Sequence, residues 1–102
     1  MTMKFNTTEI NTLKEAIQQY RGREGNFNSN APEVEVLGKL SGGEQGEFNT
    51  LELKIILLIL DENITYINNY EYLGLTKEES TRNKERIVVP LEKIKNSILK
   101  TL

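Results

Sequence analysis

Hydrophobic residues recur along much of this chain at spacings of three and four, the period of an α-helix with one apolar face. In the first third of the sequence, the positions with this spacing are Ile10, Leu13, Ile17 and Tyr20. We predict a helix over residues 7–21, because Gly22 and Gly25 follow directly and both favour a helix end. The first element is therefore an amphipathic helix.

The second periodic stretch is also the most apolar part of the chain. Its seam, with spacings of four, three, four and three, consists of Leu53, Leu57, Leu60, Ile64 and Ile67. Four further apolar residues lie outside that seam: Ile55, Ile56, Leu58 and Ile59. A helix over residues 50–73 is therefore apolar nearly all round and needs cover on several sides. We expect a second copy of the protein to supply part of that cover.

The last periodic stretch predicts a helix over residues 76–102. Its apolar face consists of Ile87, Leu91, Ile94 and Ile98. Pro90 lacks the N–H group that would bond to the carbonyl of Arg86, so the helix must kink or restart near Pro90. Gly74 suits a helix end and Thr76 can cap the next helix, which predicts a tight helical hairpin.

One phrase that begins a helix occurs twice. Phe5-Asn6-Thr7-Thr8-Glu9-Ile10 is repeated in type as Phe48-Asn49-Thr50-Leu51-Glu52-Leu53. In each copy Asn can cap the helix, and the Glu three residues later can bond back to the cap. Thr76 with Glu79 is a looser third version. These three signals predict where the helices begin.

Turn-forming residues dominate the segment between the first two predicted helices. We predict a loop over residues 22–48, in which the alternation from Glu33 to Val36 allows at most a short strand over 33–37. The fold class that follows is mainly α, a small bundle with an N-terminal helix, a long loop and a C-terminal antiparallel helical hairpin. At 102 residues, the chain is expected to form one domain over 1–102.

Composition narrows the function classes. The chain has no cysteine and no histidine, so thiolate metal sites and any Ser-His or Cys-His catalytic pair are excluded. We therefore expect a protein that is not an enzyme and that carries no cofactor and no metal. The formal net charge is −2, which does not favour general attraction to nucleic acid or anionic membranes. No apolar run approaches the ~20 residues of a membrane span, and we expect a cytoplasmic protein.

Two short segments resemble parts of a known family. Leu40-Ser41-Gly42-Gly43-Glu44-Gln45 resembles the signature motif of ABC-type ATPases, and Leu57-Leu58-Ile59-Leu60-Asp61-Glu62 resembles their Walker B strand. The resemblance implies a signature loop that contacts the γ-phosphate of ATP in an opposite subunit, with Asp61 serving Mg²⁺ and Glu62 activating water. The chain has no G-x-x-x-x-G-K-[ST] phosphate loop. A signature-like fragment, or a decoy for an ABC-type partner, is therefore a remote alternative.

The favoured hypothesis is a small non-catalytic protein–protein interaction module that regulates or inhibits a larger protein. An amino-acid composition rich in Asn, Ile and Lys suggests a bacterial or phage source. The partner is an unknown protein, and we expect a homodimer formed through the apolar second helix. The candidate interaction residues are Leu57, Ile64, Tyr66, Ile67 and Tyr70. Tyrosines are included because they are favoured at interfaces, where they bury a large area and keep a polar tip.

The alternative function is binding of nucleic acid by the last helix. Seven basic and four acidic residues lie in 77–102, whereas 33–76 holds two basic and eight acidic residues. The candidate residues are Arg82, Lys84, Arg86, Lys93 and Lys95. Interspersed glutamates make an ordinary solvated helix face the simpler interpretation, so nucleic acid is a less favoured partner. Binding that weakens strongly as salt rises is the mark of this alternative.

Overall fold

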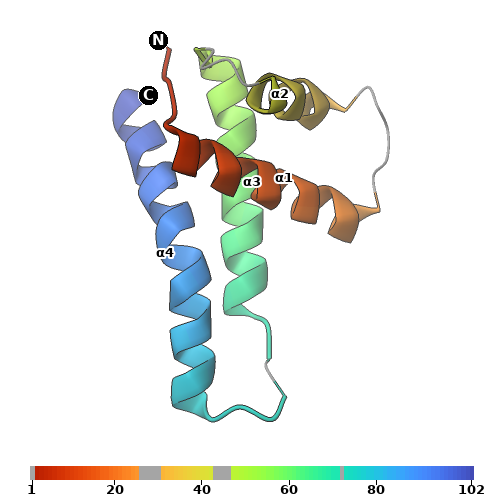
Figure 1. The fold of residues 1–102 in the computed structure, drawn as a ribbon, viewed down its shortest axis with the longest axis vertical. Coiled ribbons are helices and arrows are strands. Elements are labelled where there is room, and N and C mark those ends of the chain that lie inside the picture. Colours follow the sequence, from red (N-terminus) through yellow and green to blue (C-terminus); the bar gives the residue numbers. More distant parts are fainter. Residues whose placement is uncertain (1, 26–30, 43–46, 72) are drawn as a thin grey trace.

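Four α-helices make up the fold of the part of the chain that the structure describes. The computed structural model describes residues 2–25, 31–42, 47–71 and 73–102. Its helices are α1 (Thr7–Glu24), α2 (Pro32–Ser41), α3 (Thr50–Asn68) and α4 (Lys77–Thr101). The predicted mainly-α fold with a C-terminal helical hairpin is confirmed. In Figure 1, α3 and α4 run antiparallel side by side, α1 crosses them, and α2 lies beside the first half of α3.

The predicted caps begin three of the helices. Asn6 Oδ1 accepts from the backbone N–H of Glu9 at 2.8 Å, and the Asn6 N–H donates to the Glu9 carboxylate at 2.9 Å. The same reciprocal pair joins Asn49 and Glu52, with both distances 2.9 Å. Thr76 Oγ1 accepts from the backbone N–H of Glu79 at 3.1 Å and begins α4. Each cap pairs backbone N–H groups that no helical carbonyl can reach.

The two repeated phrases also contact each other. The rings of Phe5 and Phe48 are buried, with centroids 5.4 Å apart at a tilt of 53°. Two backbone hydrogen bonds, of 3.1 and 2.9 Å, join Met3 and Phe48 as an isolated antiparallel bridge. The segments that precede α1 and α3 are thereby held together, and each Phe lies in the core ahead of its cap.

The first helix is longer than predicted. It continues through Gly22 to Glu24, and Gly25 ends it in the left-handed conformation at φ 63°. A glycine inside a helix costs only about 1 kcal/mol relative to alanine, so Gly22 destabilises the helix slightly but does not end it. The extra turn is held by Arg23, which bonds to Asn63 on α3.

The predicted loop over 22–48, with its strand at 33–37, is wrong because a helix occupies part of it. Pro32 begins α2 at a position where a missing N–H has no cost, and Glu33, Val36 and Leu40 are its buried residues. Those three residues are spaced by three and four, as on one helix face. Over only four residues, the alternation from Glu33 to Val36 fits both a strand and a helix.

The hairpin also differs in detail from the prediction. The third helix ends at Asn68 rather than at residue 73, and Gly74 takes its positive φ of 83° within the connection. The last helix is one element that runs through Pro90, so a restart is excluded. Val88 is buried with Leu91, Ile94 and Ile98, whereas the predicted core residue Ile87 is exposed.

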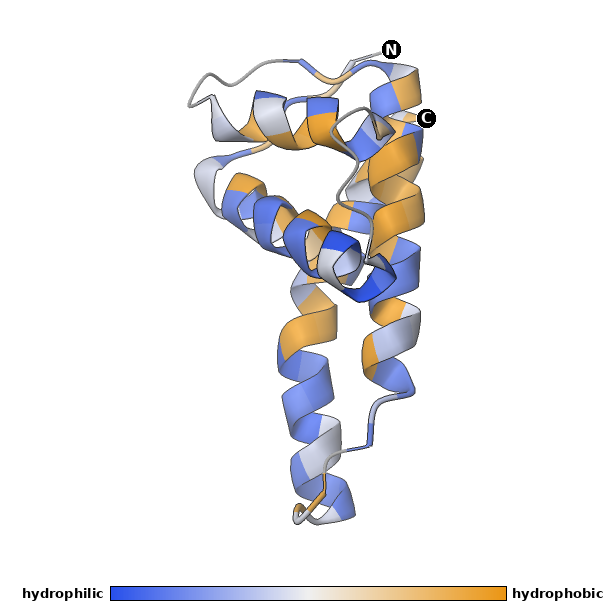
Figure 2. Ribbon diagram, turned by 90° about the vertical axis from the view of Figure 1, so that its right-hand side faces the viewer, coloured by the Kyte–Doolittle hydropathy of each residue, from blue (hydrophilic) through white to orange (hydrophobic). Residues whose placement is uncertain are grey.

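The core lies where the four helices meet. Figure 2 shows apolar residues gathered in that region, while the part of α4 nearest the connection is largely hydrophilic. α3 supplies the most buried side chains, namely Leu53, Ile56, Ile59, Leu60, Asn63 and Ile67. α1 and α2 cover one side of α3 and α4 covers another. A third side of α3 stays open, since Leu51 and Leu58 are exposed.

Candidate interaction site

The predicted interaction residues divide between the core and the surface. Ile67 is buried, and the half-buried Leu57 and Ile64 pack against the core. These three stabilise the fold, and little of their surface is left for a partner. Tyr66 and Tyr70 are exposed in the last turn of α3 and just beyond it, with relative exposures of 48% and 45%. Only the two tyrosines therefore remain candidates for contact.

Two exposed leucines follow the tyrosine pair along the chain. The rings of Tyr66 and Tyr70 pack at 6.1 Å between centroids, tilted by 44°. In the connection that follows, Leu73 is 93% exposed and Leu75 is also exposed. We call these four residues, Tyr66, Tyr70, Leu73 and Leu75, the tip surface. Sequence reasoning missed the leucines because nothing local shows that a connection leaves its apolar side chains uncovered.

A buried polar network fixes one edge of the tip surface. Asn63 is 1% exposed, and its Nδ2 donates to the backbone carbonyl of Ala16 at 2.8 Å. Its Oδ1 accepts from the Arg23 guanidinium. The same guanidinium lies 4.2 Å from the centroid of the Tyr66 ring, a cation–π geometry. Asn63 therefore positions Arg23, and Arg23 holds Tyr66 in place.

Carboxylates surround the same end of α1. Tyr20 is half-buried there, and burial raises the pKa of its phenol. The negative charges of Glu24, Glu33 and Glu62 raise the pKa further, whereas Arg23 lowers it. The neutral phenol is therefore the favoured form, because ionisation would place a further negative charge among these acids.

Glu33 is the buried member of this acidic group. Its Oε1 lies 4.0 Å from Arg21 Nε, at the limit of an ion pair. Within residues 2–25, 31–42, 47–71 and 73–102, that oxygen accepts no hydrogen bond. In the same described ranges, no three carboxylates converge on a point where a metal ion could bind.

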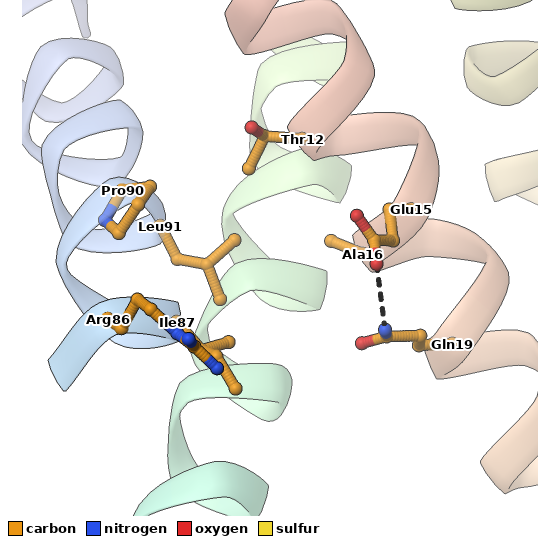
Figure 3. A pocket seen from close by; sticks show the side chains of 8 residues that line it. All are labelled: Thr12, Glu15, Ala16, Gln19, Arg86, Ile87, Pro90 and Leu91. Atoms are coloured by element: carbon orange, nitrogen blue, oxygen red, sulfur yellow. Dashed lines mark hydrogen bonds between the residues drawn. The ribbon is translucent and has the colours of Figure 1, made fainter. Parts of the chain in front are cut away.

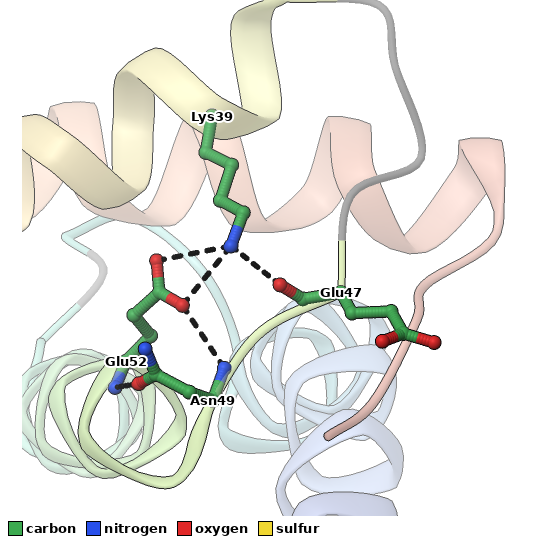
Figure 4. Close-up of polar contacts among 4 residues, drawn as sticks. All are labelled: Lys39, Glu47, Asn49 and Glu52. Carbon is green, nitrogen blue, oxygen red and sulfur yellow. Dashed lines mark hydrogen bonds and ion pairs between the residues drawn. The ribbon is translucent and has the colours of Figure 1, made fainter.

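A second polar cluster joins α2 to the start of α3 (Figure 4). Lys39 Nζ lies 3.0 Å from Oε1 of Glu52, the carboxylate that also completes the Asn49 capping box. The ammonium also donates to the backbone carbonyl of Glu47 and lies 4.8 Å from the Phe48 ring centroid. One cation thus fastens α2 to the cap of α3. Its partners are a capping carboxylate, a backbone carbonyl and a core ring, so we infer that the cluster stabilises the fold rather than binding a ligand.

The fold does not support the resemblance to ABC-type ATPases. Leu57–Glu62 lies in the middle of α3, whereas the Walker B motif is a strand, so that part of the resemblance is contradicted. Asp61 pairs with Lys95 of α4 at 2.6 Å. Leu40 and Ser41 end α2, and Gly43, Glu44 and Gln45 lie outside the described residues.

The basic residues of α4 do not form one uninterrupted cationic surface. Lys95 is paired with Asp61, and Lys84 donates to the backbone carbonyl of Asn68 at 3.0 Å. Arg82, Arg86 and Lys93 are exposed.

Arg86 lines a groove of about 230 Å³ between α1 and α4 (Figure 3). Glu15 lies on the α1 side of that groove, where it accepts a long hydrogen bond from Gln19, 3.5 Å between heavy atoms. Ile87, Pro90 and Leu91 also line it, which accounts for the exposure of Ile87. Acidic and neutral side chains thus dilute the positive field that a phosphate backbone would need.

The open side of α3 is the surface that the predicted seam did not identify. Leu51 is 69% exposed and Leu58 57% exposed, and Ile55 beside them is half-buried. The exposed polar residues on this side are Lys54, Asp61, Glu62 and Thr65. We call Leu51, Lys54, Leu58, Glu62 and Thr65 the outer face of α3. The sequence shows that α3 has more apolar residues than one buried face needs. Which stripe of α3 stays exposed depends on how the other helices pack.

Comparison with known proteins adds no family. No family model, no curated protein and no solved structure matches the chain. None of the helices in the described ranges combines the length and the apolar character needed to cross a membrane. The exposed surfaces of the molecule are therefore the remaining guide to its function.

Proposed function

We propose that the protein is a small non-catalytic protein-binding module that regulates or inhibits a larger protein, in the cytoplasm of a bacterium or as a phage product. The tip surface is the proposed contact region. The observation that carries this proposal is the group of four exposed apolar or aromatic residues within positions 66–75. Single exposed leucines are ordinary on protein surfaces, whereas four exposed apolar or aromatic residues within ten positions favour an interaction site.

The chemistry of the tip surface suits a protein partner. Tyrosine buries a large area with little loss of conformational freedom, and burial of one Leu side chain stabilises a complex by roughly 1.5–3 kcal/mol. Tyr66 is already held by Arg23, so less entropy is lost when it binds. The tip surface contains no nucleophile–base pair, which is why we propose binding rather than catalysis.

The proposal is tested by capture from a lysate of the source organism with three forms of the purified chain. The test variant is Tyr70→Ala/Leu73→Ala, and the matched control is Ile87→Ala/Val89→Ala, which truncates two exposed apolar residues of α4. We expect the wild type and the control to retain one common protein, and the test variant to bind it at least about tenfold more weakly. Equal capture by both variants, or no capture by any form, contradicts the proposal.

Self-association is the second part of the proposal, in which a homodimer is formed through α3. The alternative, nucleic-acid binding by Arg82, Arg86 and Lys93, has less support because acidic side chains lie nearby. A titration with duplex DNA at rising salt decides it. Affinity that falls steeply with salt favours the alternative, and no measurable binding at low salt removes it.

A further inference from the structure

We infer that a second copy of this chain packs on the outer face of α3, with the two α3 helices antiparallel and Leu58 at the twofold axis. This inference rests on the self-association part of the proposed function, and it adds the face, the direction and the register. The proposed occupant is a second copy because Lys54 and Glu62 of the outer face form opposite-charge pairs when two copies run antiparallel.

The centre of the face is apolar and uncovered. Leu58 and Leu51 are seven residues apart and therefore lie on the same side of α3, two turns from each other. The Asp61–Lys95 contact at 2.6 Å fixes how α3 and α4 lie side by side. Leu58 precedes Asp61 by three residues and the exposed Leu99 follows Lys95 by four, so the antiparallel register brings both leucines to the same side of the hairpin.

The charges specify the direction. Lys54 lies four residues before Leu58 and Glu62 four residues after it, and both are exposed. In an antiparallel pair centred on Leu58, Lys54 of each copy faces Glu62 of the other, which gives two opposite-charge contacts per dimer. A parallel pair in the same register would instead bring Lys54 against Lys54 and Glu62 against Glu62. Like charges that face each other across an interface oppose association, so the parallel arrangement is disfavoured.

The size of the face indicates how tightly the copies associate. α3 has 19 residues and is therefore about 28 Å long, and the exposed stripe along one helix of that length is a small contact surface. Stable complexes bury about 800 Å² per partner. We therefore expect a reversible dimer that dissociates on dilution. Because the helices are antiparallel, the two tip surfaces lie at opposite ends of the dimer and can engage two partner molecules.

The test measures solution mass against concentration by light scattering or sedimentation for a charge-swap series. Lys54→Glu alone and Glu62→Lys alone each bring like charges together, and we expect the dimer dissociation constant to rise about tenfold. The double variant Lys54→Glu/Glu62→Lys restores opposite charges and returns the constant to within about threefold of the wild type. Lys77→Glu, on an exposed residue at the start of α4, makes the same change in net charge as Lys54→Glu and leaves the dimer unchanged.

A covalent test reports the axis directly. The chain has no cysteine, so Leu58→Cys introduces the only thiol. Mild oxidation should link most of this variant as a dimer, whereas Leu73→Cys, which is more exposed, should remain largely monomeric.

A wild type that stays monomeric at all concentrations overturns the inference, and so does a double variant that fails to dimerise. Neither result affects the capture experiment, which tests the tip surface separately.

Discussion

Replacing Asn63 by alanine tests whether the buried polar network holds α1 against α3. The change removes the 2.8 Å bond to the Ala16 carbonyl and the bond from Arg23, from a side chain that is 1% exposed. The Ala16 carbonyl keeps its helical partner, so the loss at that end is about 1 kcal/mol. The bond from the charged Arg23 contributes more, about 1.5 kcal/mol, and the small cavity adds to it. The total is about 3 kcal/mol.

The assay is chemical denaturation followed by circular dichroism, with thermal unfolding as a second measure. For a domain of this size, a loss of about 3 kcal/mol lowers Tm by at least about 10 °C. The matched control is Asn96→Ala, which truncates an exposed Asn inside α4 and should change stability by less than about 0.5 kcal/mol. If Asn63→Ala and the control unfold at the same denaturant concentration, the network does not hold these helices together.

Three further changes test other parts of the fold. Pro90→Ala supplies the missing N–H at an exposed position, so the free energy of unfolding should rise, by up to about 3 kcal/mol in a urea titration, and a decrease contradicts the account of α4. Lys39→Met keeps the aliphatic stem but removes the contacts with Glu52 and the Glu47 carbonyl, and should cost about 1 kcal/mol in the same titration. Tyr20→Phe tests the raised pKa of the phenol: the native state holds this proton more tightly than the unfolded chain, so the wild type should lose stability relative to the variant as pH rises above about 10. A difference between Tyr20→Phe and wild type that stays constant up to strongly alkaline pH contradicts the assignment.

Local signals predicted the parts of this fold that local interactions create. The Asn6–Glu9 and Asn49–Glu52 boxes each lie within four residues of sequence, and both form as predicted. The sequence did not predict α2 because the alternation from Glu33 to Val36 fits both a strand and a helix over so short a stretch. Gly22 favours a helix end on local grounds, but the bond from Arg23 to Asn63, forty residues away in sequence, supports the extra turn.

The same distinction between local signals and tertiary packing applies to the candidate site. The residue type of Tyr66 and Tyr70 indicates an interface, and both side chains are exposed, so they remain candidates for contact. Leu57, Ile64 and Ile67 belong to the regular apolar seam of α3, and the other helices cover that seam. Which stripe of an apolar helix is left open depends on the packing of α1, α2 and α4. No periodicity within α3 records that packing, so Leu58 could not be singled out.

Binding of another protein by the tip surface can be tested by photo-cross-linking at a single residue. A photoreactive amino acid replaces Leu73, which is 93% exposed in the connection between α3 and α4, and a second version carries it at the exposed Asn96 of α4. Both versions are irradiated in cells of the source organism. If the tip surface binds a protein, we expect one discrete cross-linked protein from position 73 and none from position 96. The absence of any product from position 73, or the same products from both positions, would contradict it.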